Sequence, residues 1–376
     1  MICQRKVFAA TVALILSAAP GHSQTTPKTT RVIWVMTDGL RPKEVFEGAD
    51  GALMTEEYHV TEDSGIKQQF SGDTPEARRA ALLPFVWSVF SQKGQIYGNR
   101  RLGSEAYVTN GFNVSYPGYN ETLTGAADPR IDGNHKTKNP NVTVLEWLNR
   151  KPAFHGQVAA FAAWNLFPFI LNAERAGFPI NAGYEPFNEL PGDPIMRLLN
   201  ELKAESPHDW AEEPFDNLTF HTAFEYLKQR KPRVLYVSLG ETDEWAHDGK
   251  YGEYLRAAHR ADGYLRMLWE TAQSMPEYRG VTTLVFSPDH GRGDGVDWRT
   301  HGKGTPDSKY IWMAFLGPDT APLGERRKIG AVTQNQLAST VGALLGEDYA
   351  SSLPGIALPI AEVLADESRP GAGRRK

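Results

Sequence analysis

The segment from Val281 to Gly291 constrains the fold of this chain more than any other part of the sequence. Its first half, Val281–Phe286, is a short apolar and β-branched run without turn residues, which predicts a buried strand. A Ser-Pro pair ends the run, and Asp289 and His290 follow directly. An acid and an imidazole just past a buried strand lie where open α/β sheets place their chemistry. For this pair alone, a surface turn in which Asp289 acts as a cap is an equally good interpretation.

Two earlier runs end in the same way. Residues 31–36 predict a strand that is followed by Asp38, and residues 233–239 predict a strand that is followed by Asp243. His247 lies four residues after Asp243, so a helix would place both side chains on one face. Each feature also has an interpretation without a functional role, because Asp38 can cap a helix and an Asp–His pair on a surface helix is often simply solvated. The repetition predicts several strands whose C-terminal ends gather acids and imidazoles.

Ser115 and His301 add two further candidates outside these strand ends. Ser115 lies in a segment rich in Gly, Asn and Pro that leads into a short helical stretch. A serine at a helix N-terminus suits a nucleophile or a metal ligand because the amides there stabilise anions, although capping is the commoner role. His301 lies between Thr300 and Gly302, shortly before a strand-like run at 311–316.

Length and composition allow one large α/β domain with an insertion, or two small domains. The chain has 376 residues, of which 41% are hydrophobic and 23% charged, enough for a sizeable core. We expect a mixed, mostly parallel sheet with helices on both faces over residues 24–367, a small cap insertion at about 173–220, and a disordered tail at 368–376. The formal net charge is −5 and no basic stripe stands out, so a nucleic acid duplex is not expected as a partner.

The N-terminus predicts a secretion signal over residues 1–23. Arg5 and Lys6 precede an apolar run at 7–19, and small residues follow, with cleavage expected near Ser23. The run is too short to serve as a stable membrane anchor. Cys3 is the only cysteine, so the mature protein would have no disulfide and no cysteine nucleophile. We therefore expect a protein of the bacterial periplasm or the medium.

The acids and imidazoles, together with the serine, are sufficient for two metal sites. Oxygen and imidazole ligands without thiolate suit Zn²⁺, with Mn²⁺ as the alternative. Three aspartates and one serine alkoxide would roughly neutralise two dications, and a metal-bound serine becomes a nucleophile near neutral pH. Two such ions can hold the attacking and leaving oxygens of a displacement at phosphorus. The proposed ligands are Asp38, Ser115, Asp243, His247, Asp289, His290 and His301.

This ordered set resembles the alkaline phosphatase superfamily, and within it the nucleotide pyrophosphatase/phosphodiesterase branch. The resemblance extends from Val32 to about Pro318, and its motifs are Thr37-Asp-Gly-Leu-Arg41, Ser115-Tyr-Pro-Gly-Tyr119, Asp243-x-x-x-His247, Asp289-His-Gly291 and His301-Gly302. It implies that one metal is bound by Asp38, Ser115, Asp289 and His290, and the other by Asp243, His247 and His301.

The sequence departs from that branch at two positions. The nucleophile there is usually threonine, whereas here Ser115 stands two residues before a proline, and Gly118 replaces the usual asparagine after it. An asparagine beyond the nucleophile helix binds a phosphoryl oxygen in the branch, and Asn134 is the nearest match here, with Asn139 second. The resemblance implies an exported metal-dependent phosphoesterase acting on a small phosphate ester, with monoesters and diesters both open.

Two rival functions remain. Sulfatases share the fold, but their formylglycine forms within Cys/Ser-x-Pro-x-Arg, and Tyr119 stands here in place of the arginine. A secreted metal-binding module without turnover belongs to a different class. The complete ligand set beside a candidate nucleophile favours the enzyme.

Overall fold

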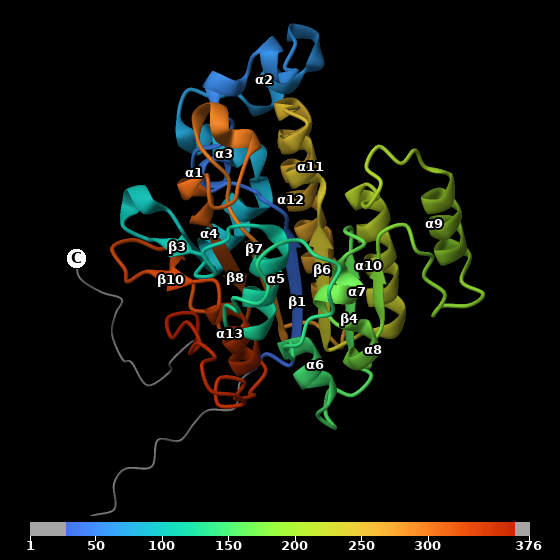
Figure 1. Ribbon diagram of the computed structural model, residues 1–376. Helices are drawn as coiled ribbons and strands as arrows, with labels where there is room; N and C mark the ends of the chain where they lie inside the picture. The colour runs from blue at the N-terminus through green and yellow to red at the C-terminus, as the bar shows by residue number, and fades with distance from the viewer. Residues whose placement is uncertain (1–27, 365–376) are drawn as a thin grey trace, which may run out of the picture.

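Strand β1 (Arg31–Thr37) lies near the middle of an eight-stranded sheet in the computed structural model, which describes residues 28–364 (Figure 1). The strand order is β5-β4-β6-β1-β7-β8-β2-β9. All neighbours from β5 to β7 are parallel, and β8 runs antiparallel to both of its neighbours. The predicted fold class is therefore confirmed. The other strands of this sheet are β2 (Gln95–Tyr97), β4 (Val158–Ala162), β5 (Ile180–Ala182), β6 (Val234–Leu239), β7 (Thr282–Pro288), β8 (Met313–Leu316) and β9 (Gly324–Glu325).

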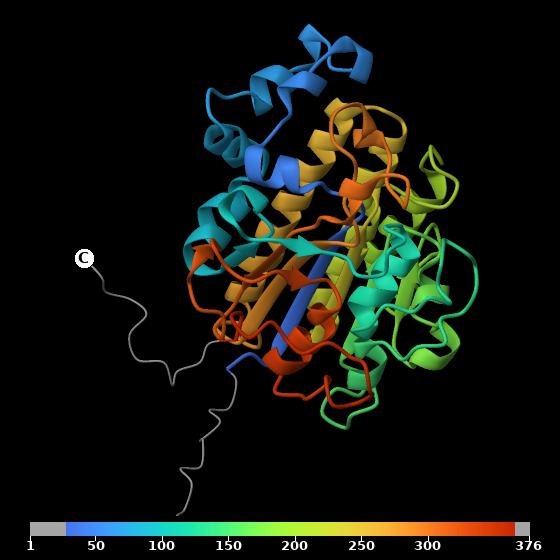
Figure 2. The same ribbon diagram turned by 60° about the vertical axis from the view of Figure 1, so that its left-hand side comes forward.

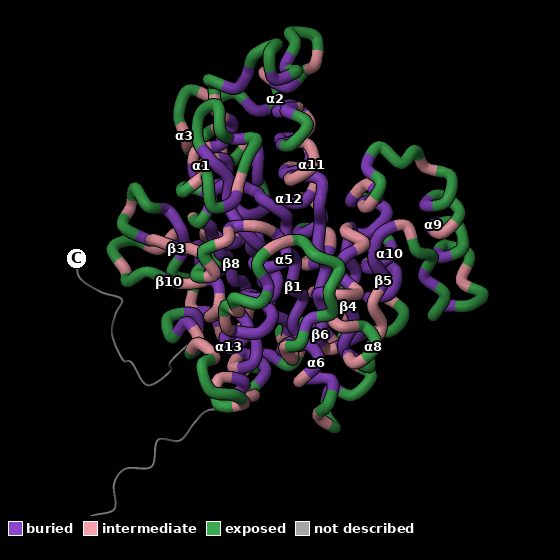
Figure 3. Tube along the Cα trace, viewed as in Figure 1, coloured by how far each residue is buried: buried purple, intermediate pink, exposed green. Residues whose placement is uncertain are grey.

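The two faces of the sheet contribute to two separate hydrophobic cores. Ile33 and Val35 of β1 belong to one core, whereas Val32, Trp34 and Met36 belong to the other. Because successive side chains of a strand point to opposite faces, a run that is apolar throughout must be covered on both sides. Helices α10 (Asp216–Arg230) and α12 (Tyr251–Ser274) cover the first face, and α5 (Ser115–Thr124), α6 (Val144–Asn149) and α13 (Gln336–Leu344) cover the second. The sheet is thus buried between two helical layers (Figures 2 and 3).

The longest helix of residues 28–364, α12 (Tyr251–Ser274), begins after Lys250 and carries one apolar stripe at helical spacing. A small second sheet pairs β3 (Ala106–Tyr107) with β10 (Val332–Thr333). The remaining helices are α1 (Pro42–Glu47), α2 (Ile66–Phe70), α3 (Pro75–Leu82), α4 (Ser91–Lys93), α5 (Ser115–Thr124), α6 (Val144–Asn149), α7 (Phe167–Ile170), α8 (Ala173–Ala176), α9 (Pro194–Glu205), α10 (Asp216–Arg230), α11 (Glu241–His247) and α13 (Gln336–Leu344). Short 3₁₀ turns cover Gly51–Leu53, Glu56–Tyr58, Glu62–Ser64, Arg100–Leu102, Gly295–Arg299 and Pro306–Lys309, and a π-helical turn covers Val86–Phe90.

The segment predicted as a cap has two different roles in the structure. Strand β5 extends the sheet by pairing with β4, and α9 packs beside α10 at the edge of the molecule, away from α5 and α11 (Figure 1). The returning segment contacts the turns that follow β4 and β6, where Glu212 O accepts a hydrogen bond from Asn165 N and Glu213 packs on Gly240. The range 173–220 thus contains a strand of the central sheet as well as helices at its edge.

The predicted signal peptide, with Cys3, and the predicted tail at 368–376 lie outside the described residues. Within the described part, no helix combines the length and the apolar character that crossing a membrane requires.

Candidate active site

Three adjacent strands bring the predicted acids together. Strand β1 lies between β6 and β7, with Thr37 level with Leu239 on one side and Pro288 on the other. Asp38 and Asp289 follow these strand ends directly, so both carboxylates emerge at the same edge of the sheet. Gly39 has a φ of +61° and its N–H donates to Asp289 Oδ1 at 3.0 Å, which ties the two turns together.

The first group of side chains converges on His290 Nε2. Asp38 Oδ1 lies 3.2 Å from this atom, Ser115 Oγ 3.3 Å and Asp289 Oδ2 3.5 Å. All four residues are buried. Ser115 is the first residue of α5, and Pro117 in the first turn suits a helix start because its missing N–H has no partner there in any case. The structure thus assembles the four residues expected to bind one metal.

The second group lies beside the first. His247 Nε2 is 2.9 Å from Asp243 Oδ2 and 3.1 Å from His301 Nε2, and Asp243 Oδ1 is 3.8 Å from His301 Nε2. Asp243 and His247 lie one turn apart on α11, as predicted. His290 stacks on His301 with ring centres 4.0 Å apart, and its Nε2 lies 4.0 Å from Asp243 Oδ1. His290 therefore stands between the two groups.

Backbone carbonyls set the tautomer of two of the imidazoles. His290 Nδ1 lies 2.8 Å from Gly291 O, and His301 Nδ1 lies 3.0 Å from Asn113 O. Because a carbonyl can only accept, each Nδ1 carries a proton, and Nε2 is the nitrogen directed into the site. Metal-binding histidines are commonly held in this way.

The electrostatics of the first group also suit a bound cation. Asp38 Oδ1 and Asp289 Oδ2 are buried and accept no hydrogen bond from the described residues, and such oxygens are costly without a counter-charge. Burial raises the pKa of Asp289, and the negative charge of the neighbouring Asp38 raises it further. Burial would lower the pKa of His290, but Asp289 and Asp38 outweigh it and the pKa is about 9. A dication bound by these donors would relieve the repulsion between the two carboxylates, so the residues fit one of the predicted metals.

The structure distinguishes between the two candidate asparagines. Asn134 lies on an exposed loop, and its Oδ1 accepts a hydrogen bond of 2.9 Å from Tyr116 N, directly after Ser115. Asn139 is buried and its Nδ2 donates to Asn120 Oδ1 and Ile170 O. Asn134 is thus the one beside the candidate nucleophile, and Asn139 has a structural role.

Sequence reasoning missed three residues of the site. Tyr119 OH donates to Asp38 Oδ2 at 3.1 Å. A Cβ on Gly118 would lie 2.4 Å from Asp289 O, so helix α5 packs directly against the backbone of the Asp-His turn. The buried Arg292 guanidinium contacts Asp243 Oδ1; burial lowers its pKa to about 9, with Asp38 opposing, which leaves it charged at neutral pH. Its place directly after Asp289-His-Gly291 was the available signal.

Comparisons with known proteins identify the fold. No protein-family model and no characterised protein sequence matches the chain. Among solved structures, alkaline phosphatase PafA is similar with a TM-score of 0.59 and 11% identity, over 90% of this chain and 99% of that one. The phosphonate monoester hydrolase of Silicibacter pomeroyi has a TM-score of 0.57 and 12% identity, over 92% and 78% of the two chains. A protein assigned as a sulfatase from Bacteroides thetaiotaomicron has a TM-score of 0.55 and 14% identity, over 92% of this chain and 76% of that one.

The protein therefore has the fold of the alkaline phosphatase superfamily, as the sequence motifs predicted. These similar structures differ in the esters that their names state, and they do not single out the nucleotide pyrophosphatase/phosphodiesterase branch. A shared fold does not by itself assign a substrate.

Proposed function

We propose that the protein is a metal-dependent hydrolase of small phosphate esters with Ser115 as the nucleophile. The observation that carries this proposal is the position of Ser115 Oγ, 3.3 Å from His290 Nε2 in a buried group with Asp38 and Asp289. A lone capping serine would not require two carboxylates and an imidazole around its hydroxyl. One metal would be held by Asp38, Ser115, Asp289 and His290, and the other by Asp243, His247 and His301.

When bound, two Zn²⁺ or Mn²⁺ ions would supply the positive charge that ionises a serine and stabilises oxyanions. The chain itself supplies the alkoxide of Ser115 and the N-terminal end of α5, whose dipole favours an anionic ester. Asn134 is held beside Ser115 by Tyr116 N, and its amide nitrogen can donate to a substrate oxygen. Tyr119 and Arg292 hold the carboxylates of Asp38 and Asp243 in place.

The test measures how fast the purified protein hydrolyses four kinds of aryl ester. We expect metal-dependent turnover of p-nitrophenyl phosphate, bis-p-nitrophenyl phosphate or an aryl phosphonate monoester, and much slower turnover of p-nitrophenyl sulfate. The ratio of the first two rates decides between monoester and diester preference. Faster turnover of the sulfate would support the sulfatase alternative, and metal binding without any turnover would support a metal-binding module.

We also propose that the protein is exported by a bacterium to the periplasm or the medium. The support is the sequence pattern of residues 1–23, with Arg5 and Lys6 before an apolar run. Fractionation of cells that express the full chain, with N-terminal sequencing of the product, tests this. A cytoplasmic protein that retains residues 1–23 would contradict it.

A further inference from the structure

Arg292 is a buried cation, and each of its three guanidinium nitrogens contacts an acceptor of the candidate active site or its loop. The residue is 2% exposed. Its Nε donates to Trp298 O at 3.0 Å, its Nη2 donates to Arg299 O at 2.6 Å, and its Nη1 contacts Asp243 Oδ1. A planar guanidinium can serve three such acceptors at once, which a lysine ammonium at the same place cannot do with the same geometry.

These contacts close a loop between the two groups of candidate ligands. Gly293 N donates to Thr300 O at 3.0 Å, so residues 292–300 form a closed loop with His290 just before it and His301 just after it. Arg292 fills the inside of this loop, since it bonds to the carbonyls of its far end. The same side chain then reaches α11 through Asp243. It therefore links the segment that carries His301 to the helix that carries Asp243 and His247.

The orientation of Asp243 follows from this contact. Arg292 contacts Oδ1, whereas Oδ2 lies 2.9 Å from His247 Nε2. One carboxylate oxygen is thus held by the guanidinium and the other is presented to the imidazole. Gly39 makes the approach possible, because a Cβ there would lie 2.7 Å from Asp243 Oδ1 and 2.8 Å from Arg292 Nη1.

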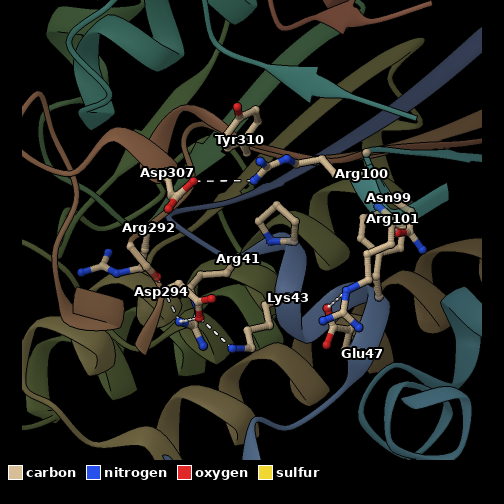
Figure 4. A pocket seen from close by; sticks show the side chains of 14 residues that line it. Arg41, Lys43, Glu47, Asn99, Arg100, Arg101, Arg292, Asp294, Asp307 and Tyr310 are labelled. Carbon is tan, nitrogen blue, oxygen red and sulfur yellow. Dashed lines mark hydrogen bonds and ion pairs between the residues drawn. The ribbon is translucent and has the colours of Figure 1, made fainter. Parts of the chain in front are cut away.

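A pocket of about 430 Å³ also borders this loop, and Arg292 is one of its lining residues. Three other cations of the pocket are paired with acids: Lys43 Nζ lies 2.7 Å from Asp294 Oδ1, Arg101 Nε 3.1 Å from Glu47 Oε1 and Arg100 Nη1 3.6 Å from Asp307 Oδ1. The guanidinium of Arg292 points away from Lys43 and Arg100 (Figure 4).

We infer that Arg292 is a positioning residue for the metal site of Asp243, His247 and His301: it orients Asp243 and holds the loop that places His301. This inference rests on the proposed metal centre. Removal of a residue that orients a metal ligand typically lowers metal affinity about 10- to 100-fold. If only the charge of Arg292 mattered, its removal would instead raise the metal affinity, because a cation beside Asp243 repels a metal ion. The positioning role and the charge effect therefore predict changes of metal affinity in opposite directions.

The deciding variant is Arg292→Lys, which keeps the charge and loses the three-way geometry. We expect metal-free wild-type protein to bind two Zn²⁺ ions in a titration against a chromophoric chelator. In Arg292→Lys, one ion should bind about 10- to 100-fold more weakly and the other almost unchanged. The matched control is Val296→Ser on the same loop, whose side chain is 76% exposed and which should bind as wild type.

Two further measurements show whether the loss of zinc affinity belongs to this metal site and whether it is caused by the missing guanidinium. His247→Ala removes a proposed ligand of the same ion, so adding Arg292→Lys to it should leave the affinity for the remaining ion unchanged. In Arg292→Ala, millimolar guanidinium chloride should restore part of the lost zinc affinity, whereas sodium chloride at equal ionic strength should not. Circular dichroism of the metal-free variants verifies that the fold is retained.

Wild-type affinity in Arg292→Lys would overturn the inference, and so would tighter binding in Arg292→Ala, which would show that the guanidinium competes with the metal. A wild-type protein that binds no zinc would instead refute the proposed metal centre itself. The two failures are therefore distinguishable.

Discussion

Two contacts position Ser115. Its Oγ lies 3.3 Å from His290 Nε2, and the N–H of the next residue, Tyr116, donates to Asn134 Oδ1. A residue that only capped α5 would tolerate replacement, because the loss of a cap costs about 1 kcal/mol of stability without affecting catalysis. A nucleophile would not tolerate it.

We therefore expect Ser115→Ala to lower kcat/KM for the best aryl phosphate by roughly 10³-fold or more. Ser115→Thr should retain part of the activity, because its hydroxyl survives. Intact mass of the wild-type peptide is the companion measurement, since conversion of Ser115 to formylglycine removes about 2 Da. That mass loss would support the sulfatase alternative, and full activity of Ser115→Ala would show that the nucleophile is elsewhere.

Lys203 of α9 provides a test of stability against pH, far from the metal ligands. The side chain is 1% exposed and its Nζ donates to Asn181 Oδ1 at 3.0 Å and Glu185 O at 3.2 Å. Burial lowers its pKa to about 8, with Glu185 opposing, whereas an unfolded lysine titrates near 10.4. Between these values the unfolded chain binds a proton that the folded chain has lost, so this group makes the protein more stable as the pH rises.

The free energy of unfolding of the wild type, relative to Lys203→Met, should therefore rise by about 2 kcal/mol between pH 8 and 10. Urea denaturation at several pH values measures this difference. The exposed Lys93→Met provides the control and should show no such slope relative to wild type. A flat difference for Lys203→Met would mean that the buried amine remains protonated.

At the scale of elements, the packing of α5 against the end of β7 decides where Ser115 lies. Gly118 allows this close approach, because a Cβ there would lie 2.4 Å from the carbonyl oxygen of Asp289. The glycine that replaces the expected asparagine thus has a packing role. The helix cannot move away from Asp289 without carrying Ser115 away from His290.

Gly118→Ala should destabilise the protein by about 1–3 kcal/mol through overpacking, in spite of the better helix propensity of alanine. It should also lower kcat, because Ser115 is displaced. Gly263→Ala in α12 is the matched control: nothing lies within 4 Å of its Cβ position, so propensity alone should stabilise by up to about 1 kcal/mol. Equal effects of the two substitutions on unfolding would contradict this account of α5.

At the scale of the whole molecule, the candidate ligands join segments that are distant in the sequence. They follow β1 and β7, begin α5, lie on α11 and end the 292–300 loop. A metal bound to all of them would cross-link these segments in the folded state only. Such binding stabilises a protein by about 2.7 kcal/mol when the free metal is 100 times Kd.

We expect about two metal ions per chain by elemental analysis. Chelation should abolish hydrolysis and lower Tm, and Zn²⁺ or Mn²⁺ should restore both. His247→Ala should bind one ion fewer. A protein that is active and free of metal would contradict the proposed mechanism.

The sequence by itself determined the sheet and most of the candidate ligands. Buried parallel strands read as continuous apolar runs, and parallel strands end at one edge, so Asp38, Asp243 and Asp289 could be grouped before any coordinates were known. Helical spacing did the same for Asp243 and His247. These inferences succeeded because they depend on local periodicity.

The tertiary structure alone decided what depends on contacts between distant segments. The choice of Asn134 over Asn139 depends on which loop residue reaches Tyr116, and spacing along the chain does not encode that distance. Strand β5 has only three residues and shows no period, so the sequence does not indicate that this segment joins the sheet. Gly118 and Arg292 have roles only because α5 and α11 approach the turn after β7, and such approaches are set by the packing of two helical layers on one sheet.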